Sequence, residues 1–101
     1  MNMTTNGGVM CAAADAKQFL CEHGSSFSQL LRDVAGESGL YLAKELQKAL
    51  DGDSVDPVGA GHALRAVSNL LIGSDIPHGV CPGAFRWHGA RVTELAARFP
   101  N

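Results

Sequence analysis

The 101-residue chain is poor in aromatic residues, at 6%, and in charged residues, at 18%. Its three cysteines allow at most one internal disulfide, which excludes a disulfide framework. No apolar run approaches the roughly 18 residues that span a membrane. The N-terminal sequence MNMTTNGGVM lacks the cationic and apolar regions of a signal peptide. We therefore expect a cytoplasmic protein with free thiols and no membrane partner.

Patterns typical of strands and of common catalytic sites are also missing. No stretch alternates apolar and polar residues over the length of a strand. The glycine-containing stretches GVCPGAF and PVGAGHA lack the lysine of a phosphate-binding loop. Paired carboxylates and a nucleophile–base–orienter set are absent too. We therefore expect a protein that is not an enzyme and needs no cofactor.

Apolar residues instead recur at helical spacing along most of the chain. The clearest helix begins after Asp56, a good N-cap, with Pro57 at its first position, and ends at Gly73. Glycines are expected to stop the other helices, at Gly24, near Gly36 and at Gly52, and Gly89 divides the last one. The pattern predicts about five short helices, at 10–23, 27–34, 38–50, 57–73 and 85–99. We expect an all-α fold: a single compact bundle in residues 9–101, preceded by a flexible tail at 1–8.

The strongest surface signal lies near the C-terminal end. The sequence Phe85-Arg86-Trp87-His88 holds the only tryptophan, and Trp87, Arg91 and Arg98 share a helical stripe separate from the Phe85–Phe99 core stripe. Trp and Arg are enriched at interface hot spots. We therefore predict a partner-binding surface formed by Phe85, Arg86, Trp87, His88, Arg91 and Arg98. The alternative is that Trp87 closes the edge of the core with arginines over its ring.

This surface predicts a small helical interaction protein that binds another protein or a larger complex. It could serve as a subunit, an adaptor or a compact inhibitor of the kind that phages and plasmids encode, and it is compatible with homo-oligomers. The net charge of −2 argues against general binding of nucleic acid. The charge is uneven, however, because residues 58–101 hold two acids and four arginines.

A second interpretation concerns DNA. The segment SQLLRDVAGESGLYLAKELQKALDG followed by DPVGAGHALRAVSNLL resembles a repressor-type helix-turn-helix. The resemblance covers less than half of the chain and depends on apolar spacing. It implies a DNA-binding regulator whose base-facing residues are Glu37, Ser38, Gly39, Leu40 and Tyr41. None of these is Arg, Lys, Asn or Gln, the usual base readers.

A third interpretation is a zinc or thiol site. Cys21, His23, His78 and Cys81 supply the two thiols and two imidazoles of a tetrahedral zinc set. However, Cys-x-His on a helix places the two side chains on different faces. Cys81 could alternatively act as a reactive thiol at a helix N-terminus. If there is no such site, Cys21 packs as a small buried residue and His23 lies at the C-terminal end of its helix.

Overall fold

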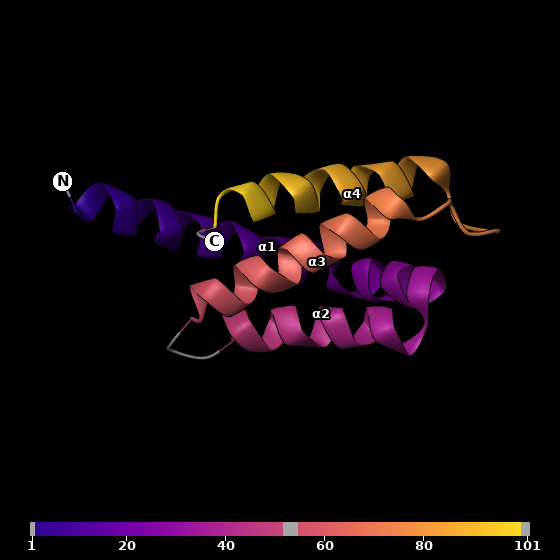
Figure 1. Cartoon of the computed structure of the whole chain (residues 1–101), viewed down its shortest axis with the longest axis horizontal. Coiled ribbons are helices and arrows are strands. Elements are labelled where there is room, and N and C mark those ends of the chain that lie inside the picture. Colours follow the sequence, from indigo (N-terminus) through magenta and orange to yellow (C-terminus); the bar gives the residue numbers. More distant parts are fainter. Residues whose placement is uncertain (1, 52–54, 100–101) are drawn as a thin grey trace.

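A computed structural model describes residues 2–51 and 55–99, with side chains from residue 10 onward. It contains four helices, α1 (Asn2–Ala35), α2 (Glu37–Leu50), α3 (Pro57–Gly73) and α4 (Pro82–Ala97), and no strand within these ranges (Figure 1). The molecule measures 48 × 22 × 22 Å along its principal axes. The predicted all-α fold is thus confirmed, but the predicted number of helices is not, since four helices form where we expect about five.

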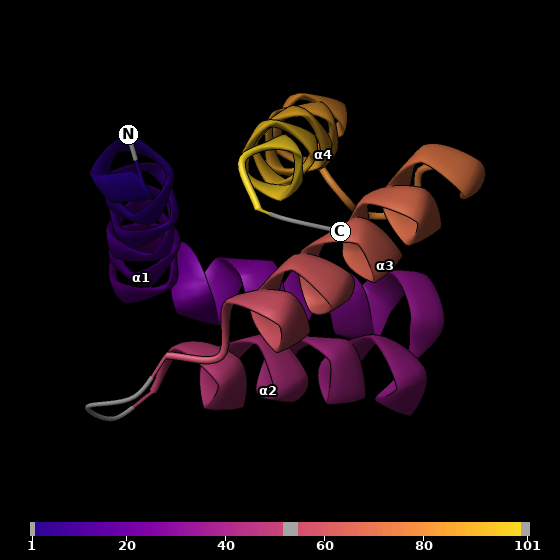
Figure 2. The same ribbon diagram turned by 60° about the vertical axis from the view of Figure 1, so that its left-hand side comes forward.

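The difference in number comes from α1, which joins the two predicted segments 10–23 and 27–34. The helix does not stop at Gly24, and the prediction of a break there is wrong. Instead, α1 is bent: the two views show its two halves running in different directions (Figure 2). Glycine and serine are common at such bends. Within α1, the Ser26 hydroxyl donates a hydrogen bond to the His23 carbonyl oxygen at 3.0 Å.

The N-terminal end of α1 includes residues 2–8, for which the sequence predicts a flexible tail. Their backbone is helical, and their flexibility stays a prediction. The inward face of the following turns agrees with the sequence, because Ala13, Ala16 and Phe19 are all buried. These small alanine side chains allow neighbouring helices to approach α1 closely.

The helices α1 and α2 form a tight hairpin around Gly36. Its φ of 63° lies in the left-handed region that favours glycine. Two positions into α2, the buried Gly39 packs directly on the backbone of Leu31 in α1. A methyl group at Gly39 would collide with the Leu31 carbonyl group, so the hairpin depends on the missing side chain.

The central helix α3 has the bounds that its sequence predicts. Asp56 accepts a hydrogen bond from the Gly59 amide at 3.0 Å, Pro57 is the first helical residue and Gly73 the last. The segment 74–81 connects α3 to α4 without a helix, and α4 begins at Pro82. The predicted division at Gly89 is wrong because α4 continues through it. The predicted stop of α2 at Gly52 lies outside the described residues.

A single apolar core joins the four helices. The helix α2 packs against α1 and α3, α3 packs against α4, and α4 also touches α1. The largest fully buried side chains are Phe27, Leu31, Leu46, Leu64, Val67, Leu71, Val92 and Leu95. Burying each of them contributes about 1.5–3 kcal/mol relative to leaving it exposed. This core fixes α4 between α1 and α3, so α4 has two flanks with different surroundings.

Candidate functional site

The candidate site lies where one flank of α4 meets α1, around the only tryptophan. The Trp87 ring centroid is 4.7 Å from that of His23 and 6.0 Å from that of Phe19, which it faces at an interplanar angle of 30°. Stacked and edge-on aromatic pairs of this kind stabilise a fixed ring position beyond the burial of area. Trp87 is nevertheless 44% exposed. One side of the ring system is thus held against α1, and the rest is open to solvent.

Behind Trp87, His88 belongs to the core. It is 6% exposed, and its ring lies parallel to that of Phe27 at a centroid distance of 6.1 Å. Its Nδ1 lies 3.0 Å from the Ala84 carbonyl oxygen. Because a carbonyl oxygen only accepts, Nδ1 carries the proton in the neutral ring. The buried Nε2 has no hydrogen-bond partner in the described part of the chain.

Burial lowers the pKa of His88, and the nearby His23 lowers it further, while the bond to Ala84 works in the opposite direction. The imidazole is therefore neutral near pH 7. A charged ring would place a second proton on Nε2, for which residues 10–51 and 55–99 offer no acceptor. His88 thus supports the aromatic cluster as a neutral packing residue.

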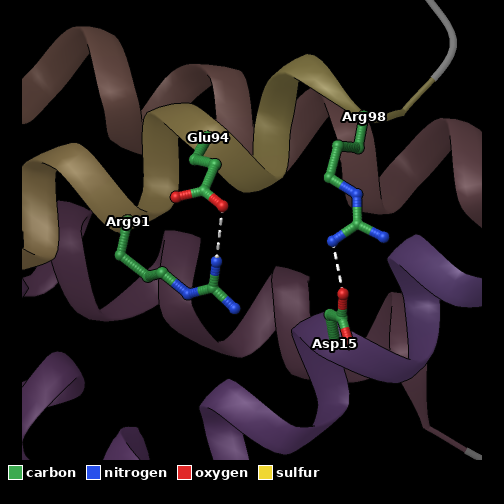
Figure 3. A network of polar contacts seen from close by, with 4 residues as sticks. All are labelled: Asp15, Arg91, Glu94 and Arg98. Atoms are coloured by element: carbon green, nitrogen blue, oxygen red, sulfur yellow. Dashed lines mark hydrogen bonds and ion pairs between the residues drawn. The ribbon is translucent and has the colours of Figure 1, made fainter.

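Two arginines of the predicted stripe are held in ion pairs along the same flank (Figure 3). Arg91 donates to Oε1 of Glu94 at 3.0 Å, one turn along α4. Arg98 donates to Oδ2 of Asp15 on α1 and so ties the C-terminal end of α4 to that helix. Ion pairs this exposed contribute little to stability, because water screens the attraction between their charges. Their main effect is to fix charged groups beside the aromatic cluster.

Together these groups form a recess of about 260 Å³, which we call the Trp87 recess. Its walls are aromatic and its rim is charged. Its lining residues are Asp15, Gln18, Phe19, Glu22 and His23 from α1 and Trp87 and Arg91 from α4. Gln18 donates to Glu22 at 2.7 Å, which holds that carboxylate at the rim. The recess is amphipathic and open on one side.

The six residues predicted as partner-binding do not form one surface. Trp87 and Arg91 line the recess, and Arg98 lies on the same flank. Phe85 and His88 are 8% and 6% exposed, so they are core residues that cannot contact a partner directly. Sequence periodicity already places both on the core stripe.

Arg86 lies on the opposite flank, along an apolar groove of about 650 Å³ between α3 and α4. Leu71, Ile72 and Ser74 of α3 form one side of this α3–α4 groove. Gly89, Ala90 and Thr93 form the other side, and Ile72 is 70% exposed at its edge. The sequence reveals neither this groove nor the α1 side of the Trp87 recess. Both depend on contacts between helices that are distant along the chain.

The predicted zinc set is not brought together. Among residues 10–51 and 55–99, no three His, Cys, Asp or Glu side chains are placed to hold a metal ion. His23 faces Trp87. Cys21 lines a different recess with Lys17 and Gln47, between α1 and α2. Cys21 is exposed and His23 lies within α1, so the packing alternative for these two residues is also wrong.

Cys81 occupies the predicted position directly before α4 and is exposed. The backbone amides of Ala84 and Gly83 lower the pKa of its thiol. Reactive thiols of this kind usually need a base and an acid that orients it. His88, seven residues further along the chain, could not act as that base, because it is buried with its Nδ1 bound to Ala84.

The residues predicted to face DNA bases do not all reach the surface of the α1–α2 hairpin. Gly39 is buried against α1, while Glu37, Ser38 and Tyr41 are exposed. Gly39 therefore serves the packing of the hairpin.

No helix in the described part of the chain combines the length and apolarity needed to cross a membrane. The chain matches no protein-family model, no curated protein and no solved structure.

Proposed function

We propose that this chain is a non-enzymatic interaction protein that binds another protein through the Trp87 recess. The observation that carries the proposal is the state of Trp87, which is 44% exposed and yet held by ring contacts with His23 and Phe19. Tryptophan and arginine are the residues most enriched among binding hot spots. A ring that is already fixed loses little conformational entropy when a partner covers it.

The recess indicates the chemistry of the partner. An apolar or aromatic side chain would cover Trp87 and Phe19 at the centre. Polar groups around it would meet the rim, where Glu22 and Arg91 offer opposite charges. A buried apolar anchor within a polar rim is the common anatomy of protein interfaces. Such a contact suits a subunit, an adaptor or a compact inhibitor, and it requires no chemistry from the chain.

The experiment compares capture of a partner from native lysate by matched variants, with untagged protein as competitor. Trp87→Ala should weaken the competable interaction about 30-fold, the effect of a hot-spot residue. Tyr41→Ala is the control, because Tyr41 is 61% exposed on α2, away from the recess. Binding that Trp87→Ala and Tyr41→Ala affect equally would refute the recess as the binding surface.

A second variant separates binding from folding. Trp87→Ala removes ring contacts and could loosen α4, whereas Arg91→Glu changes only the rim, where Arg91 bonds Glu94. Arg91→Glu should weaken binding about tenfold, with helicity unchanged and the thermal midpoint lowered by no more than a few degrees, since only the exposed pair with Glu94 is lost. If the Trp87 variant unfolds while Arg91→Glu binds normally, Trp87 is a core residue only and the proposal fails.

A further inference from the structure

The exposed row of α4 along the α3–α4 groove has a pattern that is symmetric about Ala90. Arg86 and Glu94 lie four residues on either side of Ala90, and Gly83 and Ala97 lie seven residues on either side. Spacings of four and seven place side chains on one face of a helix. All five of these residues are exposed in the structure. Along α4, this face therefore carries in order a small residue, an arginine, a small residue, a glutamate and a small residue.

We propose that a second copy of this chain packs its α4 antiparallel on this face, around a two-fold axis at Ala90. In such a pair each Arg86 lies opposite Glu94 of the other copy. A two-fold interface must be self-complementary, because the same patch serves both copies. Opposite charges at equal distances from the axis satisfy that condition twice. The rise of a helix separates the two charges of one copy by about 12 Å along α4.

The sizes of the side chains agree with the charges. Ala90 lies on the axis, and Gly83 of one copy lies opposite Ala97 of the other. Small residues at these positions allow two helices to approach closely, at the short end of the usual 8–10 Å separation. Thr93 extends along the same flank and bonds the Gly89 carbonyl oxygen and the Ser68 hydroxyl, so its polar atom is already satisfied.

The charged groups are also available for the contact. Arg86 is exposed and makes no hydrogen bond or ion pair within the described residues. Glu94 accepts from Arg91 through Oε1, which leaves Oε2 for a second donor. The edge of the groove supplies apolar area, since Ile72 is 70% exposed beside the half of α4 that contains Arg86. The C-terminal half of the partner's α4 would cover this side chain.

This contact is distinct from the Trp87 recess, because the groove and the recess lie on opposite flanks of α4. A dimer formed this way leaves both recesses open and presents two of them to a partner. Two linked sites bind a repetitive or dimeric partner more tightly than either site alone.

The test is sedimentation equilibrium of the full chain from about 10 µM to about 1 mM, where contacts of modest strength are measured. The wild type should show a monomer–dimer equilibrium. Arg86→Glu and Glu94→Arg should each raise the dissociation constant at least about tenfold, because each places like charges opposite one another twice. Lys48→Glu, on the exposed face of α2, is the control and should leave the equilibrium unchanged.

The decisive arm mixes the two reversed variants, Arg86→Glu and Glu94→Arg. The glutamate introduced in one chain would then face the arginine introduced in the other, and the unchanged Glu94 and Arg86 would also face each other. The mixture should therefore form a heterodimer, and the double variant R86E/E94R should dimerise with itself again. Misfolded chains could not produce this rescue, and Trp87→Ala should not affect it. A monomeric wild type, or a wild-type dimer that neither reversal weakens, would overturn the proposal.

Discussion

Gly39→Ala tests the tight packing between α1 and α2. The added methyl carbon would lie 2.6 Å from the Leu31 carbonyl carbon and 3.2 Å from its Cα, and closer still to its oxygen. All three atoms belong to the backbone, so no side chain can rotate away. The two helices would have to separate by roughly 1 Å, against a core packed at crystal-like density.

The magnitude follows from two opposing effects. Overpacking of this kind costs about 1–3 kcal/mol, and a clash between backbones belongs at the upper end. The replacement of glycine by alanine within a helix returns about 1 kcal/mol. The net loss of unfolding free energy is therefore about 2 kcal/mol, which lowers the melting temperature by roughly 10 °C in a domain of this size.

Urea unfolding followed by circular dichroism measures this loss, with Gly89→Ala as the matched control. Gly89 lies in the interior of α4, and a methyl group there would meet only the Leu71 Cβ at 3.9 Å, an ordinary contact. Gly89→Ala should therefore stabilise the chain by up to about 1 kcal/mol. If Gly39→Ala were as stable as the wild type, α2 would not approach α1 in the way described.

Three further predictions concern other parts of the molecule. Asp56→Ala removes the cap that bonds the Gly59 amide and should cost about 1 kcal/mol in thermal unfolding, whereas an unchanged midpoint would show that Pro57 alone starts α3. The pKa of His88 is lowered on folding, so the unfolded state binds more protons below about pH 6.5 and stability should fall as pH drops through that range. His88→Leu should flatten this dependence in urea titrations at several pH values, and an unchanged slope would assign it to other groups. The lowered pKa of Cys81 should make it the first of the three exposed cysteines to react with iodoacetamide at pH 7 by peptide mapping, and the preference should vanish in urea.

Structural features with local determinants are predictable from this sequence. The bounds of α3 follow from Asp56, Pro57 and Gly73, each of which acts on backbone groups within one turn. The turn at Gly36 is local as well. The predicted helix stop at Gly24 is wrong because a glycine without a following proline weakens a helix but does not end it. Buried side chains on both sides of Gly24, such as Phe19 and Phe27, hold α1 helical through that position.

The candidate site was predictable only on its α4 side. The stripe that contains Trp87 and Arg91 follows from helical periodicity alone. Its contact with His23 joins residues 64 positions apart, and no local signal encodes it. The same holds for Gly39, whose importance appears only once Leu31 lies against it. Helix faces can therefore be predicted from this sequence, but the pairing of those faces cannot.

The central claim is that a partner covers the Trp87 recess. Site-specific photo-crosslinking tests it directly, with the reactive side chain placed at Gln18, on the rim of the recess, and in a control at Lys44, on the exposed face of α2. In native lysate, position 18 should crosslink to one partner that untagged wild type competes away and that Trp87→Ala abolishes, while position 44 should give no such product. Equal crosslinking from both positions, or a competable partner captured only from position 44, would contradict the claim.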